Sequence, residues 1–188
     1  SNTKLIINIL GISLGMKYLY DNGHTHNDLI PTNILLSSKF YPKLTDYGIA
    51  NYLVNTDPKH KNVLNNPYYT APEFYNGDIE YSFESDIFSF AMILYEFYSG
   101  CPPFVNGTSK QQIAKNIAAG ERPDENKLPE GPIKELIKKC WSKDPKMRPS
   151  FDEIIEDYTI KREEFWPKDV DDSEVETYLN MLGIYLNN

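Results

Sequence analysis

The chain has 188 residues, of which 40% are hydrophobic and 24% are charged, a balance typical of one soluble globular domain. A chain of this length buries about 70% of its unfolded surface, so its core needs no disulfide or metal to hold it together. The formal net charge is −8, which argues against nucleic acid or an anionic membrane as the main partner.

Cysteine and histidine are too few and too scattered for a structural zinc site. The two cysteines, Cys101 and Cys140, lack metal-ligand spacing, and there are only three histidines. Free cysteines are the rule in reducing compartments, so we expect a cytoplasmic location. No signal peptide or membrane-spanning run is visible. The chain begins at Ser1 rather than at a methionine, and we interpret it as a piece of a longer polypeptide.

The first predicted element is a helix over residues 3–23. Its apolar face consists of Leu5, Ile6, Ile9, Ile12, Met16, Leu19 and Tyr20. Two short strands follow over residues 33–38 and 41–48, and the turn between them predicts a small hairpin. Residues 49–69 are polar and aperiodic, which predicts a long loop that is either functional or disordered.

The second half of the chain is predicted to consist mostly of helices. Residues 83–100 are apolar on every side, which predicts a buried central helix that ends at Gly100. Two shorter helices with exposed lysines are predicted over residues 109–120 and 131–141. A last long helix is predicted over residues 150–165.

Capping boxes mark the starts of the last two predicted helices. Ser150 stands three residues before Glu153, and Ser173 stands three residues before Glu176. The second box opens a helix in the acidic tail, whose apolar stripe is predicted to dock on the body of the domain. The stripe consists of Val175, Leu179, Leu182 and Tyr185.

Three polar residues near the front of the chain suggest chemistry. Asp28 precedes Asn33 by five positions, and Asp46 follows the second strand. Each alone is more often part of a turn or a cap than a ligand. Together they supply what phosphoryl transfer requires, namely a carboxylate that orients a hydroxyl nucleophile and oxygen ligands that hold magnesium against nucleotide phosphates.

Five motifs carry a resemblance to the eukaryotic protein kinase family, and especially to its tyrosine-kinase-like serine/threonine members. In chain order they are "HNDLIPTN", "DYG", "NNPYYTAPE", "ESDIFSFAMILYE" and "CWSKDPKMRPSF". They resemble the catalytic loop, the Asp-Phe-Gly turn, the end of the activation segment, the central helix of the large lobe and the closing Arg-Pro motif. Small-molecule kinases share the catalytic loop but lack the Ala-Pro-Glu and Arg-Pro-Ser elements.

The resemblance implies a mainly α fold, the large C-terminal lobe of a kinase, with a small β-hairpin at the catalytic and magnesium loops. We assign the lobe to residues 1–160 and an acidic extension with an amphipathic helix to residues 161–188. The chain contains no glycine-rich loop and no strand lysine, so the small lobe is absent. That lobe would come from the same polypeptide or from a partner protein.

The resemblance also assigns roles to single residues. Asp28 matches the catalytic base, Asn33 a catalytic residue and magnesium ligand, and Asp46 the main magnesium ligand. Asn33 and Asp46 are thereby implied to bind the cofactors Mg²⁺ and ATP. Two further roles are structural. Glu73 and Arg148 match a buried ion pair, whereas Asp86 is expected to cap the catalytic loop with His26 packed beneath it.

Three departures from the family pattern bear on activity. Asn27 replaces the arginine that receives the phosphate of a phosphorylated activation segment. Ile30 replaces a lysine that reaches towards the γ-phosphate, and the loss of one such contact typically costs about 10²–10³ in rate. Asn66 replaces a threonine whose hydroxyl meets the catalytic base.

Two functions therefore stay open at this point. The chain is either the large lobe of a kinase that transfers phosphate from Mg-ATP to protein hydroxyls once a small lobe completes it, or a pseudokinase-like scaffold without catalysis. Asp28, Asn33 and Asp46 favour the first, and the three departures favour the second. Pro31 and the "PYYTAPE" spacing favour serine/threonine over tyrosine substrates. A plain helical interaction domain is excluded by five motifs in the right order.

Overall fold

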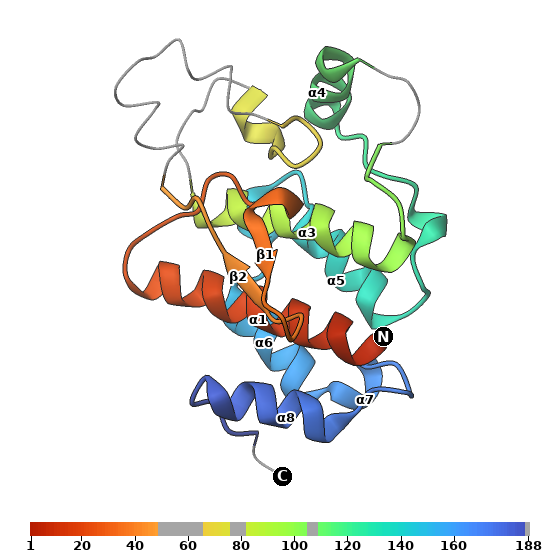
Figure 1. The fold of residues 1–188 in the computed structure, drawn as a ribbon. Coiled ribbons are helices and arrows are strands. Elements are labelled where there is room, and N and C mark those ends of the chain that lie inside the picture. The colour runs from red at the N-terminus through yellow and green to blue at the C-terminus, as the bar shows by residue number, and fades with distance from the viewer. Residues whose placement is uncertain (49–65, 76–81, 105–108, 187–188) are drawn as a thin grey trace.

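The computed structural model describes residues 1–48, 66–75, 82–104 and 109–186, and these residues form helices around one small hairpin (Figure 1). The elements are α1 (Asn2–Asp21), β1 (Ile34–Leu36), β2 (Pro42–Leu44), α3 (Phe83–Ser99), α4 (Lys110–Ala119), α5 (Pro132–Cys140), α6 (Phe151–Ile160), α7 (Arg162–Phe165) and α8 (Asp172–Met181). This confirms the predicted mainly α architecture. Within the described ranges, no helix is long and apolar enough to span a bilayer.

The hairpin is shorter than predicted. β1 and β2 pair antiparallel, with Ile34 opposite Leu44 and Leu36 opposite Pro42. The turn is closed by the amide of Ser37, which donates to the carbonyl oxygen of Tyr41 at 2.9 Å. Two residues that were predicted to lie in the strands adopt other backbone conformations. Asp46, beyond β2, has a left-handed φ of 63°. Asn33 lies in a 3-10 turn that begins at Pro31. Beyond the hairpin, the predicted loop lies outside the described residues as far as residue 65.

α1 is buried on more than the one face that its periodicity predicts. Ile7 and Leu10, which lie off the predicted face, are fully buried, whereas Leu5 and Tyr20 on that face are only half-buried. The reason is that α1 packs against α6 and α3 but also against β2 and α8. The hairpin therefore packs against α1 (Figure 1).

α3 is the buried central helix that its composition predicts. Its buried side chains include Ile87, Phe88, Phe90, Ala91, Met92, Ile93, Leu94 and Tyr95. The helix begins at a capping box between Ser82 and Ser85 and ends at Gly100, whose φ of 68° is left-handed. Glycine adopts this conformation without steric cost, so Gly100 ends the helix as expected.

The last helices differ in detail from prediction. The Ser150–Glu153 capping box is present, but the helix that it opens stops at Ile160, and the separate turn of α7 follows. At α8 the cap is Asp171, which accepts from the amide of Glu174, so the predicted capping box at Ser173 is wrong. Of the predicted stripe, two side chains are buried, Val175 and Leu179, and two are largely exposed, Leu182 and Tyr185.

Candidate active site

Asp28 and Asn33 lie together on the loop between α1 and β1. The side-chain amide nitrogen of Asn33 donates to the backbone carbonyl and to the carboxylate of Asp28, both at 2.9 Å. Pro31 begins the 3-10 turn that places Asn33 there, because its fixed φ suits the first position of such a turn. Since both donated hydrogen bonds use the nitrogen, the amide oxygen of Asn33 remains available to a cation.

Asp46 is brought to the same site by the second strand. The carbonyl oxygen of Asn33 accepts from the backbone amide of Thr45 at 3.0 Å and from its hydroxyl at 3.3 Å. Asp46 follows directly, is exposed, and has a left-handed φ of 63°. Aspartate is among the few residues other than glycine that adopt this conformation readily. The chain therefore presents the Asp46 carboxylate next to the Asp28–Asn33 pair.

The electrostatics of Asp28 suit a proton acceptor. Burial raises the pKa of its carboxyl, and the negative charge of Asp46 raises that pKa further. The hydrogen bond from Asn33 opposes the shift because it stabilises the ionised form. A carboxylate with a raised pKa is a stronger base, which is useful to a group that receives a proton from a hydroxyl.

The loop is fixed from below by Asp86, at the start of α3. Its two carboxylate oxygens accept from the backbone amides of His26 and Asn27, at 2.7 and 2.8 Å. Burial raises the pKa of Asp86 to about 7, while these two amides and the hydroxyl of Tyr20 oppose the shift. Asp86 thus caps the loop as predicted. Asn27 has a left-handed φ of 69°, which asparagine tolerates better than most residues.

His26 packs beneath the loop, close enough to Asp46 for the charge of that carboxylate to act on its ring. The side chain is fully buried. Burial lowers its pKa, because a charged imidazolium would be desolvated there. The expectation that His26 packs beneath the loop is therefore confirmed.

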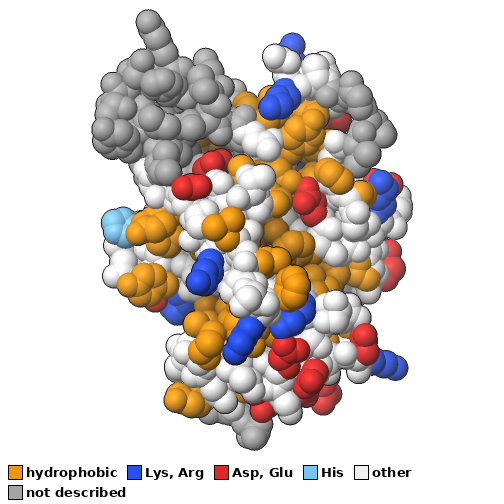
Figure 2. All heavy atoms as spheres, in the orientation of Figure 1, with side chains coloured by type: hydrophobic (Ala, Val, Ile, Leu, Met, Phe, Trp, Pro, Cys, Tyr) orange, Lys and Arg blue, Asp and Glu red, His pale blue; other side chains and the backbone are white. Residues whose placement is uncertain are grey.

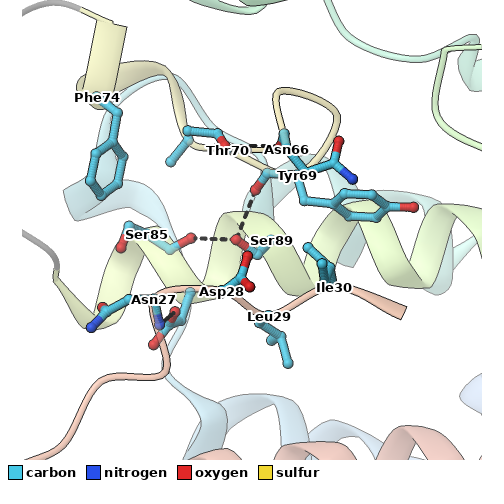
Figure 3. A pocket seen from close by; sticks show the side chains of 12 residues that line it. Asn27, Asp28, Leu29, Ile30, Asn66, Tyr69, Thr70, Phe74, Ser85 and Ser89 are labelled. Carbon is cyan, nitrogen blue, oxygen red and sulfur yellow. Dashed lines mark hydrogen bonds between the residues drawn. The ribbon is translucent and has the colours of Figure 1, made fainter. Parts of the chain in front are cut away.

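A small pocket lies above Asp28, between the loop that joins α1 to β1, the segment from Asn66 to Phe74 and α3 (Figure 3). Its volume is about 20 Å³, which is room for about one water molecule. Asn27, Ile30 and Asn66 all line it, so all three departures from the family pattern lie around the pocket that holds the candidate base. An aliphatic side chain at Ile30 contributes no charge to that space.

The wall of this pocket is anchored to α3 by contacts that sequence reasoning missed. Ser89 donates its hydroxyl to the carbonyl oxygen of Tyr69 at 2.8 Å, and the Tyr69 hydroxyl bonds to the carboxylate of Glu96. Within the wall itself, Thr70 donates to the carbonyl oxygen of Asn66 at 2.9 Å. One signal was present in the sequence, because an acid such as Glu96 inside an otherwise apolar helix requires a polar partner.

The donor set fits magnesium only together with a ligand. In the part of the chain that the structure describes, no three His, Cys, Asp or Glu side chains gather as a metal centre. Asn33 and Asp46 offer one amide and one carboxylate, both oxygen donors of the kind that Mg²⁺ prefers. An ion held by so few protein groups takes its remaining ligands from water and phosphate oxygens, as in kinase sites.

Comparison with known proteins decides the family. The sequence model for protein tyrosine and serine/threonine kinases matches residues 1–158. The chain belongs to this family. Its helical body with one hairpin is the large lobe of the kinase fold, as the motifs predicted, and the described residues hold no second sheet.

Curated relatives agree with this assignment. The chain is similar to receptor-interacting serine/threonine-protein kinase 1 of Homo sapiens, at 34% identity over 80% of this chain and 25% of the relative. It is also 34% identical to the dual specificity protein kinase pyk3 of Dictyostelium discoideum, over 82% of this chain and 11% of the relative. Serine/threonine-protein kinase VIK of Arabidopsis thaliana is 37% identical over 78% of this chain and 35% of the relative. The chain therefore spans about a quarter or less of the first two relatives' length.

Proposed function

We propose that this chain is the large lobe of an active protein kinase that transfers the γ-phosphoryl group of Mg-ATP to serine or threonine hydroxyls of protein substrates. A small lobe, from the same polypeptide or from a partner protein, would complete the nucleotide site. The observation that carries the proposal is the Asp28–Asn33 pair. Asn33 binds Asp28 through its nitrogen and leaves its amide oxygen for a cation, beside the carboxylate of Asp46.

Each of the three residues has a distinct part in this proposal. Asp28 orients the substrate hydroxyl and accepts its proton, for which its raised pKa is suited. Asn33 and Asp46 hold Mg²⁺, which when bound neutralises charge on the β- and γ-phosphates. Asn33 also fixes the rotamer of the Asp28 carboxylate through its hydrogen bond of 2.9 Å. Loss of Asn33 would therefore disturb both metal binding and the base.

A scaffold without catalysis is the second candidate, and Ile30 is the observation that favours it. Its side chain lines the pocket beside Asp28, where the family pattern has a lysine. Asn66 lines the same pocket in place of a threonine. A scaffold would retain the fold, and with it the capped loop, without transferring phosphate.

Phosphoryl transfer and Mg²⁺-dependent nucleotide binding by a polypeptide that includes a small lobe separate the two candidates. An active kinase transfers phosphate, and Asp28→Asn lowers the rate by about 10²–10⁴ with little change in nucleotide binding. Asp46→Asn weakens the Mg²⁺-dependent binding itself. Glu121→Gln is the matched control, because it neutralises an exposed acid just beyond α4 and should leave both activities unchanged. Nucleotide binding without transfer, or no Mg²⁺-dependent binding, supports the scaffold and refutes the enzyme.

A further inference from the structure

The C-terminal helix α8, the turn of the hairpin and the start of α1 meet at one junction. The ring of Tyr178 on α8 packs on the ring of Tyr41 in the hairpin, with centroids 4.6 Å apart. Lys4 on α1 joins all three elements. Its ammonium group donates to the carbonyl oxygen of Lys39 at 2.8 Å, pairs with the carboxylate of Glu174, and lies 4.9 Å from the centre of the Tyr41 ring.

Gly11 makes the close approach at this junction possible. A Cβ atom at that position would lie 2.2 Å from the hydroxyl oxygen of Tyr178 and 2.5 Å from Cγ of Pro42. Real side chains do not tolerate such distances, so only glycine lets α8 and β2 touch α1 at the same point. Pro42 is itself paired with Leu36 across the hairpin. The tail helix and the hairpin thus share one contact surface on α1.

Two polar contacts fix the start of the tail helix on the same side of α1. The backbone amide of Asp171, the cap of α8, donates to the hydroxyl of Thr3 at 2.9 Å. The side-chain amide of Asn2 donates to the carboxylate of Asp169 at 2.7 Å. Because α8 also buries Val175, Tyr178 and Leu179, the helix is packed onto the lobe along its length.

The hairpin depends on such support for its position. It has only three residue pairs in two strands, and an isolated hairpin of this kind is at best marginally stable in water. Leu35 and Leu36 of β1 are 54% and 53% exposed, so β1 buries little of its apolar surface. Hydrophobic side chains are open to solvent on this face of the molecule (Figure 2). Yet Asn33 stands immediately before β1, and Asp46 stands two residues after β2. Any movement of the hairpin therefore moves both proposed magnesium ligands.

We propose that α8 braces the hairpin, and that Tyr178 and Lys4 are positioning residues for Asn33 and Asp46. They touch neither proposed ligand and act through Tyr41, Lys39 and Pro42. That α8 supports the hairpin follows from the packing alone, whereas an effect on metal binding rests on the function proposed above. The acidic extension then supports the site. Its loss increases the mobility of the hairpin that carries Asn33 and Asp46, while the core around α3 stays folded.

Amide hydrogen exchange on Tyr178→Ala tests the brace without any reference to catalysis. The reporters are the amides of Ser37 and Thr45, which bond within the hairpin and to Asn33, and the reference is the set of α3 amides in the core. We expect the two hairpin amides to exchange about tenfold faster or more, measured against α3. Hairpin protection that is unchanged, or that falls only in step with α3, overturns the proposal.

Three further variants make the exchange result specific. Tyr178→Phe keeps the ring and should restore wild-type protection. Trp166→Phe is the matched control. Trp166 lies in the same extension as Tyr178, but its 2.8 Å hydrogen bond goes to the carbonyl oxygen of Tyr158 on α6 and not to the hairpin. This substitution should not change hairpin exchange relative to α3. Lys4→Met replaces a partly exposed side chain, so it reports on the brace even if Tyr178→Ala fails to fold, and it should also speed hairpin exchange.

A second measurement tests the consequence for the metal site in a polypeptide that includes a small lobe. Tyr178→Ala should raise the Mg²⁺ concentration needed for half-maximal ATP binding by about tenfold, as disturbed outer-sphere support does at other metal sites. Equal Mg²⁺ dependence in wild type and variant overturns the positioning role. If the wild type shows no Mg²⁺-dependent binding, the proposed function fails, and the brace is decided by the exchange result alone.

Discussion

Glu73 and Arg148, which lie 75 positions apart in the chain, form a two-pronged ion pair. The two guanidinium nitrogens of Arg148 donate to the two carboxylate oxygens of Glu73, at 2.7 and 2.8 Å. The Arg148 side chain has no exposed surface, and it also donates to the carbonyl oxygens of Ser142 and Glu84. The predicted pair therefore ties the segment beside the candidate active site to the end of the lobe and to the start of α3.

Arg148→Met should lower the free energy of unfolding by about 3–5 kcal/mol, because it leaves the Glu73 carboxylate without its partner in a largely buried position. Chemical denaturation measures this loss. Arg162→Met is the control, since Arg162 pairs with Glu176 at 3.9 Å on the surface and such pairs contribute about 0–1 kcal/mol. Equal effects of the two substitutions would show that the Glu73–Arg148 pair does not stabilise the lobe.

Asp86→Asn should destabilise the protein by about 1–3 kcal/mol at neutral pH. Two loop amides donate hydrogen bonds to the Asp86 carboxylate, and in the variant one of them would face the NH₂ group of the asparagine. The deficit should grow as the pH falls. Burial raises the pKa of Asp86 to about 7, against an ordinary value of 3.8, so the folded state binds the extra proton between those values. The wild type therefore gains stability from this carboxyl as pH falls from about 7 towards 4, and the variant does not.

Unfolding curves of both proteins at pH 7.5, 6 and 5 test this expectation. Tyr20→Phe serves as the control, since it removes a hydroxyl that donates to the carbonyl oxygen of Phe83 and, more weakly, to Asp86. It keeps both loop amides capped and should cost only about 1 kcal/mol. A stability difference between wild type and Asp86→Asn that stays constant with pH would mean that Asp86 keeps an ordinary pKa.

His26→Phe should change the acid sensitivity of the fold in the opposite direction. His26 is fully buried, and its lowered pKa keeps it neutral in the folded state, whereas the unfolded chain takes up a proton below about 6.5. The wild type therefore keeps its full free energy of unfolding above pH 6.5 and loses part of it as the pH falls below that value. Phenylalanine cannot be protonated, so the variant should become more stable than wild type as the pH falls from 7 to 5.

Thermal unfolding at pH 7.5 and 5 measures the His26 effect. At pH 7.5 we expect the variant to lie within about 1 kcal/mol of wild type, since the ring is replaced by one of similar size in the same buried position. Parallel pH curves for wild type and His26→Phe would contradict the prediction.

Local patterns were sufficient for the helices whose signals lie within one segment. α3 is apolar on every side and ends at a glycine, so both its burial and its end were predictable. The start of α8 was not. Asp171 before Glu174 and Ser173 before Glu176 have the same spacing and each fits a cap. The structure uses Asp171, whose own amide is held by Thr3, a contact 168 positions distant that no local pattern contains.

The residues of the candidate site likewise fall into those that the sequence predicted and those that depend on distant contacts. Asp28, Asn33 and Asp46 were found because a motif fixes their spacing along the chain, and the structure places them at one site. The contacts of Tyr69 with Ser89 and Glu96 were missed, since they join an irregular segment to a helix 20 and 27 positions later. The burial of Ile7 and Leu10 was missed for a related reason, because α8 and β2 reach α1 only in the folded state.

Ile30→Lys is the substitution that tests whether the site is limited by one missing charge. Ile30 lines the pocket beside Asp28 and is only half-buried, so a lysine there can extend its ammonium group towards solvent and phosphate without disrupting the core. In a polypeptide that includes a small lobe, we expect phosphoryl transfer to rise by up to about 10²-fold, the rate that one electrostatic contact to a transferring group typically contributes.

Single-turnover transfer from labelled ATP measures the Ile30→Lys effect, with Ile30→Met as a control of similar length and no charge. A gain with lysine but not with methionine means that the wild-type site is complete except for this charge, and it favours the enzyme over the scaffold. No transfer from either variant, although Mg²⁺-dependent ATP binding is intact, means that this one charge does not limit the site, and it supports the scaffold. Asn66, on the opposite wall of the same pocket, is then the next residue to replace, by threonine.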